Sequence, residues 1–436
     1  MDTLEILARH MLVDGYPLIF DMEKSQGCRL RDKKTGKDYL DFFSFFASSP
    51  VGLNHPEMQT KEFLNHLAQV AVNKPSCSDI YTDEMANFVD TFSRVGIPDF
   101  LPNLFVISGG ALAVENALKT SFDWKVRKNF KKGIANEIGR QVIHFEQSFH
   151  GRSGYTLSLT NTFDPRKTMY FPKFDWPRVS SPKITFPLED NFEKIVMAEE
   201  KSCQEIHDAI DKYGDDVAAL IIEPLIQSEG GDNHIRPQFF EKLREMTEKH
   251  EIMLIYDEIQ TGVGLTGKFW GFEHFSEKAR PDIIAFGKKM QVCGILVSNK
   301  VKEVKDNVFE ESSRINSTFG GNLVDMFRAT KYLEIIEKEN LVSKTEINGK
   351  YMLDQLYEIQ EEFPNKVTNA RGKGFMIAFD LPTTEIRDKT KKVAYDKYLL
   401  LLECGEKTIR FRPYLTTEKA EIDEGLNILR EVLKEL

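Results

Sequence analysis

The stretch Val217-Ala-Ala-Leu-Ile-Ile-Glu223 is the first of three apolar runs, each of which ends at an ionisable residue. The second run is Ile252-Met-Leu-Ile-Tyr-Asp257, and the third is Ile283-Ile-Ala-Phe-Gly-Lys-Lys289. Short apolar runs bounded by polar residues or glycine predict strands that are buried on both faces of a parallel sheet. Ligands of such sheets bind at the carboxyl ends of the strands, so we expect Asp257 and the lysine pair to share one site.

A carboxylate and a lysine at neighbouring strand ends are what pyridoxal 5'-phosphate requires. The lysine amine forms a Schiff base with the aldehyde, and the carboxylate keeps the pyridine nitrogen protonated, so that the ring accepts electrons from a carbanion. Lys288 and Lys289 both fit this role, because burial of either ammonium favours the neutral, nucleophilic amine. Asp257 is the expected partner of the ring nitrogen, and Gln260 the expected donor to the phenolic oxygen. The alternative for Asp257 is a carboxylate that caps the turn after its strand.

The composition argues against several other classes of protein. The net charge of −10 argues against a general nucleic-acid surface. The five cysteines are scattered without a CxxC pair, and the nine histidines show no ligand spacing, so we expect reduced thiols in a cytoplasmic protein and no metal site. No basic and apolar leader begins the chain, and no apolar run approaches ~20 residues, so neither a signal peptide nor a membrane span is expected.

The chain length of 436 residues corresponds to two or three domains at roughly 150 residues each. Residues 61–320 alternate apolar strands with helical patterns, which predicts an α/β domain with a mostly parallel sheet flanked by helices. Residues 1–60 contain a predicted hairpin, and residues 321–436 a smaller α/β pattern. We expect the two end segments to build a smaller α/β domain beside the large one.

Two further motifs stand next to predicted strands. Ser108-Gly-Gly-Ala111 lies between a strand and a helix, where glycines let backbone N–H groups approach an anion, although a simple tight turn explains the same pattern. Phe149-His-Gly-Arg152 follows another strand and offers an aromatic ring for stacking and an arginine for a carboxylate. Arg410 is a second candidate for a substrate carboxylate. Each arginine taken singly is also compatible with an ordinary ion pair.

Gly262-Val-Gly-Leu-Thr-Gly267 fits the GxGxxG pattern and follows a strand, which makes a nicotinamide-dependent dehydrogenase the rival hypothesis. That hypothesis requires a helix after the glycines and an acidic residue about 20 positions further on. Lys268-Phe-Trp-Gly-Phe272 is a poor helix opening, and no clear acidic strand end follows at that offset. A glycine-rich loop beside the site is the favoured interpretation.

Asp257-Glu-Ile-Gln-Thr-Gly-Val-Gly264 and Pro281-Asp-Ile-Ile-Ala-Phe-Gly-Lys-Lys289 resemble the signature of the class III pyridoxal-phosphate-dependent aminotransferases. The resemblance extends over nearly the whole chain and implies the type I aminotransferase fold and a homodimer. The family places its Schiff-base lysine at a fixed distance before a Cys-Gly or Gly-Gly element, here Cys293-Gly294, and on that spacing Lys289 is selected over Lys288.

Two branches of the family compete. Phe149-His-Gly-Arg152 and Ser228-Glu-Gly-Gly-Asp-Asn-His234 resemble both 4-aminobutyrate and L-lysine 6-aminotransferases. Leu40-Asp-Phe-Phe-Ser-Phe-Phe-Ala-Ser-Ser49 and Phe286-Gly-Lys-Lys-Met-Gln-Val-Cys-Gly294 are more similar to the lysine branch. The resemblance therefore implies transfer of the ε-amino group of L-lysine to 2-oxoglutarate, with 2-aminoadipate 6-semialdehyde and L-glutamate as products. Another ω-amino acid such as 4-aminobutyrate is the alternative donor.

The resemblance also implies roles for individual residues. Glu229 would neutralise Arg410 while lysine is bound and move away when a dicarboxylate arrives, although it stands one position later after Glu223-Pro224 than in much of the family. Arg152 would bind the carboxylate far from the reacting atom. The resemblance further implies that Gly110 and Ala111 bind the cofactor phosphate and that Phe149, Asp257 and Gln260 contact the cofactor ring. Thr318 would reach the cofactor phosphate of the partner subunit. Asn316 and Ser317 would line the lysine pocket.

Overall fold

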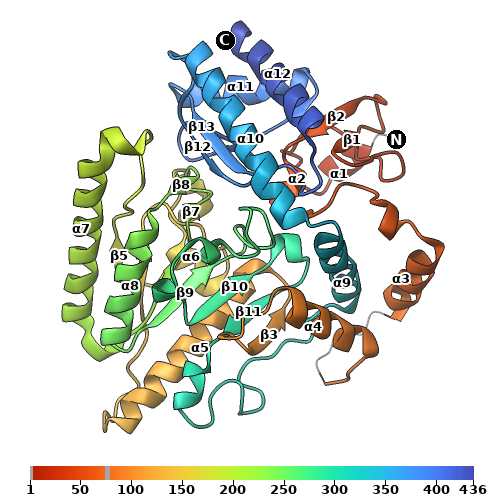
Figure 1. Cartoon of the computed structure of the whole chain (residues 1–436). Helices are drawn as coiled ribbons and strands as arrows, with labels where there is room; N and C mark the ends of the chain where they lie inside the picture. Colours follow the sequence, from red (N-terminus) through yellow and green to blue (C-terminus); the bar gives the residue numbers. More distant parts are fainter. Residues whose placement is uncertain (1–2, 74–78) are drawn as a thin grey trace.

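A seven-stranded sheet with helices on both faces forms the centre of the computed structural model, which describes residues 3–73 and 79–436 (Figure 1). The strand order is β3-β11-β10-β9-β6-β4-β5. Neighbouring strands from β10 to β5 run parallel, and β11 is antiparallel to both β10 and β3. The strands are β3 (Asn103–Ile107), β4 (Gln141–Phe145), β5 (Arg178–Val179), β6 (Val217–Ile222), β9 (Met253–Asp257), β10 (Ile283–Phe286) and β11 (Cys293–Val297).

The three apolar runs are confirmed as adjacent central strands. Every residue of β6, β9 and β10 is buried. Alternate residues face two different cores, since Leu220 and Ile222 of β6 pack on one side and Ala219 and Ile221 on the other. A strand that must be apolar on both faces has no polar alternation, which explains why these segments appear as continuous runs in the sequence.

Helices cover both faces of this sheet. The long helix α5 packs against β6, β10 and β11, and α8 packs against β9. A second group, α3, α4 and α9, packs together beside the sheet (Figure 1). The helices of this part are α3 (Lys61–Asn73), α4 (Asp83–Val95), α5 (Gly110–Lys131), α6 (Gly154–Leu159), α7 (Leu188–Tyr213), α8 (Pro237–Lys249) and α9 (Leu323–Lys338).

The two ends of the chain share a sheet. Strand β2 (Asp38–Asp41) pairs antiparallel with β1 (Arg29–Arg31) and parallel with β14 (Leu399–Leu400), which confirms the predicted hairpin. A separate four-stranded sheet has the order β12-β13-β16-β15. Its strands are β12 (Thr368–Lys373), β13 (Met376–Asp380), β15 (Leu402–Cys404) and β16 (Thr408–Phe411), and the nearby helices are α10 (Leu341–Glu362), α11 (Thr384–Asp396) and α12 (Lys419–Glu435). The domain boundaries 1–60, 61–320 and 321–436 stay a prediction.

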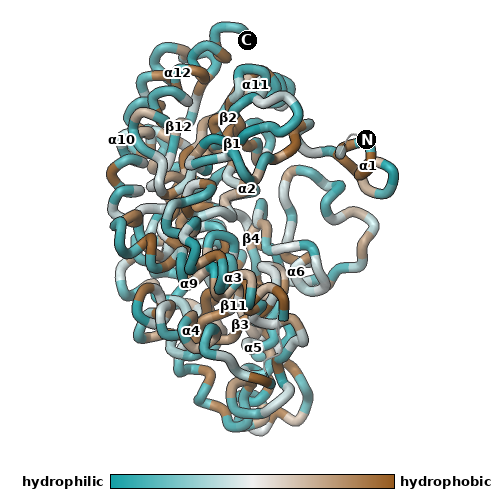
Figure 2. The backbone as a smooth tube through the Cα atoms, turned by 90° about the vertical axis from the view of Figure 1, so that its right-hand side faces the viewer, coloured by the Kyte–Doolittle hydropathy of each residue, from teal (hydrophilic) through white to brown (hydrophobic). Residues whose placement is uncertain are grey.

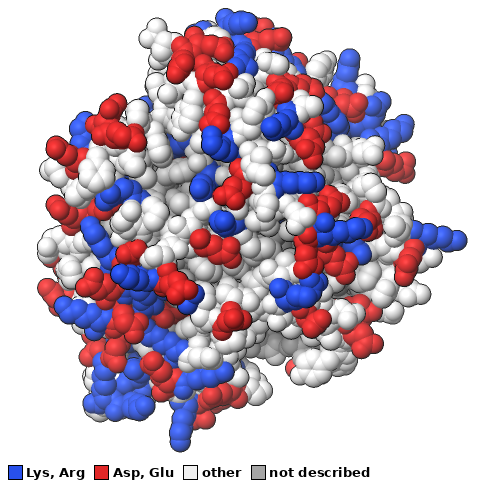
Figure 3. Space-filling model, viewed as in Figure 1, with Lys and Arg blue, Asp and Glu red and all other residues white. Residues whose placement is uncertain are grey.

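The distribution of hydropathy and charge follows this layering. Figure 2 shows hydrophobic backbone concentrated around β3 and β11, and the N-terminal helix α1 (Thr3–Ala8) standing away from the body. None of the α1 residues is buried. On the face shown in Figure 3, acidic and basic side chains are interspersed. Among the described residues, no helix has the length and apolar character needed to cross a membrane.

One close backbone approach gives a test of how the C-terminal elements pack. Gly349 lies in the middle of α10, and a Cβ atom there would stand 2.2 Å from the carbonyl oxygen of Gly374, which belongs to the turn between β12 and β13. Helix propensity alone favours alanine over glycine at such a position. The clash involves backbone on both sides, so it is not relieved by a change of rotamer.

We therefore predict that Gly349→Ala lowers the free energy of unfolding by about 1–3 kcal/mol, although helix propensity alone would make alanine more stable at this position. Urea denaturation measures this change. Gly15→Ala is the control, because no atom lies within 4 Å of a Cβ at Gly15. Equal stability of Gly349→Ala and the wild-type protein would show that α10 and the turn at Gly374 do not pack as closely as described.

Candidate active site

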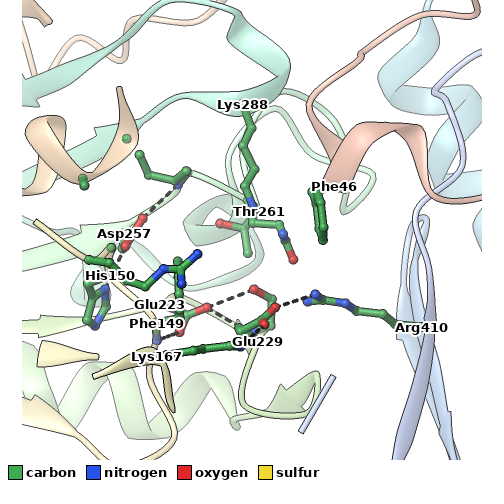
Figure 4. A pocket seen from close by; sticks show the side chains of 17 residues that line it. Phe46, Phe149, His150, Lys167, Glu223, Glu229, Asp257, Thr261, Lys288 and Arg410 are labelled. Carbon is green, nitrogen blue, oxygen red and sulfur yellow. Dashed lines mark hydrogen bonds and ion pairs between the residues drawn. The ribbon is translucent and has the colours of Figure 1, made fainter. Parts of the chain in front are cut away.

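A cavity of about 460 Å³ lies at the carboxyl ends of the central strands (Figure 4). Its wall combines residues of β9, the loops after β4, β6 and β10, the start of α5, and β16 of the C-terminal sheet. The cavity thus forms where the predicted strand ends meet the smaller part of the molecule. The lining residues are Phe46, Gly110, Ala111, Phe149, His150, Gly151, Arg152, Lys167, Glu223, Ser228, Glu229, Asp257, Ile259, Gln260, Thr261, Lys288 and Arg410.

Asp257 is fixed at the end of β9 by two contacts. One carboxylate oxygen accepts the Ile259 N–H at 3.1 Å, and the other lies 2.7 Å from Nδ1 of the buried His150. These two contacts hold the Asp257 carboxyl at the cavity wall. Sequence reasoning did not assign a role to His150, although its place in Phe149-His-Gly-Arg152 put it directly after a strand.

Glu223 follows β6 and lies behind the same wall. It accepts hydrogen bonds from the backbone N–H groups of Phe149 at 3.0 Å and Ser228 at 2.9 Å. Burial raises the pKa of the Glu223 carboxyl to about 7, although the nearby His150 acts in the opposite direction. Glu223 therefore fixes the loop that presents the Phe149 ring to the cavity.

The N-terminus of α5 offers an anion site. Its N-cap, Gly109, has φ +105° and makes no side-chain capping bond, and Gly110 and Ala111 begin the helix at the cavity wall. The first N–H groups of a helix lack partners within the helix and carry a partial positive charge, so they bind phosphate well. Gly110 and Ala111 thus lie at a helix start on the cavity wall, and their contact with a phosphate stays a prediction.

The two lysines after β10 point to different places. Lys288 is half-buried and lines the cavity, whereas the described lining residues do not include Lys289. The Lys289 side chain is buried, and its Nζ donates to the carbonyl oxygen of Ser49 at 3.3 Å. Of the two lysines, the structure thus brings Lys288 to the cavity, whereas Lys289, the choice from the family spacing, contacts Ser49, and its role as the reactive amine stays a prediction.

The reason lies in the backbone of the turn. Gly287 precedes a short 3-10 turn, η6 (Lys288–Met290), in which Lys288 has φ +47° and the following Gln291 has φ +65°. Within this turn, Lys288 shares the cavity wall with Asp257, whereas Lys289 contacts the Ser49 carbonyl oxygen. Strained backbone of this kind costs roughly 1–3 kcal/mol per residue and is concentrated at functional sites.

Lys289 and Gln291 instead hold a second strained segment. In the turn labelled α2 (Ser44–Ala47), all four residues have positive φ, between 39° and 62°. Gln291 Nε2 donates to the Ser48 carbonyl oxygen at 2.6 Å, next to the Lys289 contact with Ser49. These contacts keep Phe46 at the cavity wall, where its ring faces the labelled lining residues in Figure 4.

Gln260 is oriented by an arginine that sequence reasoning missed. Its Oε1 accepts from Arg412 Nε at 3.3 Å and Nη2 at 3.1 Å, and Arg412 is also paired with Asp232 at 2.5 Å. Since the oxygen of the amide is occupied by Arg412, the amide nitrogen is left as a donor for the cavity. This arrangement suits the predicted contact of Gln260 with a phenolic oxygen.

Glu229 and Arg410 form the predicted ion pair. Glu229 Oε2 accepts from Arg410 Nη2 at 2.6 Å, and Glu229 Oε1 accepts from Lys167 Nζ at 2.5 Å. Burial alone would raise the pKa of Glu229, but the two cations outweigh it and lower the pKa to about 2. Glu229 is thus an anion at any physiological pH.

The additional residue before Glu229 is taken up locally. Leu225 has φ +64°, and the Ile226 N–H donates to the Pro224 carbonyl oxygen at 2.7 Å, which closes a tight γ-turn. The chain then forms the hairpin of β7 (Ile226–Gln227) and β8 (Asn233–His234), whose loop carries Glu229. The turn therefore allows Glu229 to reach Arg410 despite the longer spacing.

The other sequence candidates divide into two groups. Arg152 is exposed at the cavity wall, as expected for a residue that binds a substrate carboxylate. Asn316, Ser317 and Thr318 are not among the lining residues of this single chain, and Thr318 is exposed. Their segment is tied to the start of α5 by a hydrogen bond from the Ser108 hydroxyl to the Phe319 carbonyl oxygen.

The chain belongs to the class III aminotransferases, since the model of the family "Aminotransferase class-III" matches residues 11–433. Curated relatives support this assignment. The L-lysine-epsilon aminotransferases of Mycobacterium bovis and Amycolatopsis lactamdurans are both 47% identical to it, each with 98% of this chain and 94% of the relative covered. The mitochondrial 4-aminobutyrate aminotransferase of Homo sapiens is 32% identical, with 94% and 84% covered.

Solved structures agree on the fold. The lysine aminotransferase from M. tuberculosis in its internal aldimine form is 47% identical and superposes with a TM-score of 0.96, with 99% of this chain and 98% of that chain covered. The predicted α/β aminotransferase fold is thereby confirmed, and the cofactor is pyridoxal 5'-phosphate. The dehydrogenase hypothesis is wrong, and residues 258–270 after β9 indeed form turns with no helix.

The cavity fits this cofactor in its chemistry. The start of α5 supplies N–H donors for a phosphate, Asp257 an anion for a pyridinium, and Phe149 an aromatic ring. Lys288 supplies an amine, and burial, reinforced by Arg410, lowers its pKa to about 8 even though Glu229 opposes this shift. An amine with this pKa is still mainly protonated at pH 7, but its neutral fraction is far larger than that of an exposed lysine, whose pKa is about 10.4.

This pKa predicts the reactivity of Lys288 in the cofactor-free protein. With a pKa of about 8, half of the Lys288 amine is neutral at about pH 8. Its acetylation rate should therefore reach half of the maximum near that pH. Surface lysines as a class should continue to accelerate up to about pH 10.4. Peptide mass spectrometry after brief labelling at several pH values measures both. A Lys288 midpoint at the surface value would contradict the described burial.

Proposed function

We propose that this protein transfers the ε-amino group of L-lysine to 2-oxoglutarate, and so forms 2-aminoadipate 6-semialdehyde and L-glutamate. The observation that carries the proposal is the ion pair of Glu229 with Arg410 in a cavity that also presents Arg152. A pocket with one permanently available arginine and one arginine covered by a mobile carboxylate suits two substrates of different charge. The 47% identity to L-lysine-epsilon aminotransferases supports lysine as the donor.

In the lysine half-reaction, the substrate reacts at its ε-amine, so its α-carboxylate lies far from the reacting atom. Arg152 binds that carboxylate. The apolar part of the lysine chain then passes Arg410, whose side chain is buried. An unpaired buried guanidinium is costly, and Glu229 removes that cost by remaining on it.

In the second half-reaction, glutamate and 2-oxoglutarate react next to their α-carboxylate. Arg410 binds this group after Glu229 has moved, and Arg152 binds the carboxylate at the other end. Two arginines at opposite ends of the substrate select a dicarboxylate of defined length. The side chain of Glu229 is partly exposed, at 26%, which leaves room for the movement.

The bound cofactor supplies an aldehyde for the substrate amine and a ring that accepts electrons. Gly110 and Ala111 would hold its phosphate, Phe149 would contact its ring, and Asp257 and Gln260 would hold the ring edge. Lys288 would be the attachment point, and its free amine would accept the proton from Cε of lysine. The pKa of about 8 suits an amine that must both accept and return a proton near neutral pH.

We also propose a homodimer in which Thr318 reaches the cofactor phosphate of the partner subunit and Asn316 and Ser317 complete the partner's lysine pocket. The exposure of Thr318 and of large apolar side chains such as Leu12 and Tyr81 supports this assembly. We place the enzyme in the cytoplasm, because the four described cysteines are free thiols. Cys77 lies outside the described residues.

The proposal predicts the order of donors. With 2-oxoglutarate as acceptor, kcat/KM for L-lysine should exceed the values for ornithine and 4-aminobutyrate by about tenfold or more. Side-by-side steady-state assays measure this order. 4-Aminobutyrate is the alternative donor, because the 32% identical relatives carry that name, and a preference for it would overturn the choice of lysine.

A pair of variants tests the assignment of the attachment lysine. Lys288→Ala should remove the visible absorbance of the bound cofactor, its borohydride-sensitive attachment and turnover, because Lys288 is the proposed attachment point at the end of β10, and Lys167 in the same cavity is engaged by Glu229. Lys289→Ala should keep the attachment, since its Nζ contacts the Ser49 carbonyl oxygen instead of the cavity. Absorbance spectra and peptide mass spectrometry after borohydride reduction identify the modified residue. Attachment at Lys289 in the wild-type protein would reverse the assignment.

A further inference from the structure

Glu229 is held by a second cation, to which neither the sequence nor the function above gives a role. Lys167 Nζ lies 2.5 Å from Glu229 Oε1, while Arg410 Nη2 holds the other oxygen at 2.6 Å (Figure 4). The two cations come from different parts of the molecule. Arg410 stands on β16, and Lys167 ends the 3-10 turn η2 (Pro165–Lys167) in the loop between α6 and β5.

We propose that Lys167 is a positioning residue of the substrate switch, which keeps Glu229 paired when the α-carboxylate of glutamate takes Arg410. This inference rests on the proposed function, in which Glu229 must leave Arg410 for the second half-reaction. Lys167 would thereby set the affinity of the enzyme for dicarboxylates rather than for lysine.

The two partners of Glu229 differ in freedom to move. Arg410 is 1% exposed, and its strand is paired on both sides, by β13 and β15. The Lys167 side chain is 24% exposed and belongs to a loop that also exposes Tyr170 and Phe171. A lysine ammonium on a flexible four-carbon chain can follow a moving carboxylate, whereas the guanidinium of a buried strand residue cannot.

The balance of charges is complete only if Lys167 takes part. With lysine bound, Arg152 holds the substrate carboxylate, and Glu229 neutralises Arg410. With glutamate bound, Arg410 and Arg152 hold the two substrate carboxylates, so Glu229 has lost its arginine. Glu229 would then be a half-buried anion without a partner, which is unfavourable. Lys167 supplies the third cation, so that every carboxylate has a partner in both states.

Phe149 keeps this cation at the cavity. Lys167 Nζ lies 5.8 Å from the centroid of the Phe149 ring, within the range of a cation–π interaction. Glu223 fixes the Phe149 loop from behind. The ammonium therefore rests between the aromatic ring and the Glu229 carboxylate, and it accompanies Glu229 without leaving the site.

Half-reactions of the holoenzyme test the proposal. In Lys167→Gln, the second-order rate constant of the half-reaction with glutamate should fall about tenfold. The second-order rate constant of the half-reaction with lysine should change by less than about twofold. Lys167→Arg should restore most of the glutamate reaction, because it returns the cation. Arg166→Gln is the matched control, because this substitution removes the same charge one position away. The Arg166 side chain is 82% exposed and pairs with Asp164. Stopped-flow absorbance of the cofactor measures each half-reaction separately.

Binding of glutarate to the resting holoenzyme gives a second measurement that needs no turnover. Glutarate has the two carboxylates of glutamate without the amine, and pentanoate is the matched monocarboxylate. Calorimetry should show a Kd for glutarate about tenfold higher in Lys167→Gln than in the wild type, with the Kd for pentanoate unchanged. Glutarate affinity that is unchanged, or equal losses for lysine and glutamate, would overturn the proposal. If lysine itself is not a donor, the proposed function fails, and the glutarate titration still tests Lys167.

Discussion

Burial of β6, β9 and β10 on both faces is the constraint on which the rest of the structure depends. A strand between two apolar cores has no place for an ionisable side chain, so the charged groups of these segments are confined to the ends. The parallel pairing of the three strands brings those ends to one edge of the sheet. Glu223, Asp257 and Lys288 meet there because the packing excludes them from elsewhere.

The site that results joins two parts with different tasks. The edge of the large sheet supplies the fixed groups, of which the His150–Asp257 pair is the clearest example. The C-terminal sheet supplies Arg410, and loops supply the partly exposed Glu229 and Lys167. A rigid base for the cofactor with a movable charge at the substrate end fits an enzyme that must bind a cation-bearing donor and a dicarboxylate in turn.

Much of this could be predicted from residue patterns, and the failures have physical causes. The strands and the turn before α5 depend on local composition, so they were predicted at nearly the observed positions. Lys289 was selected by counting residues to Cys293-Gly294, yet direction in a turn depends on φ. The turn has left-handed backbone at Lys288 and Gln291, and in it Lys288 lines the cavity while Lys289 contacts Ser49. Arg412, Phe46 and Lys167 carry no motif of their own, so only their positions in space reveal them.

The sequence by itself determined the fold class, the cofactor chemistry and the set of strand ends that form the site, because continuous apolar runs and their terminal residues are local features. Tertiary structure decided which of two adjacent lysines enters the cavity and which cations share Glu229. Those outcomes depend on contacts between segments far apart in the chain, such as Lys289 with Ser49 and Glu229 with Lys167 and Arg410. No spacing along the chain encodes such distances, because they arise only when the sheets and loops pack together.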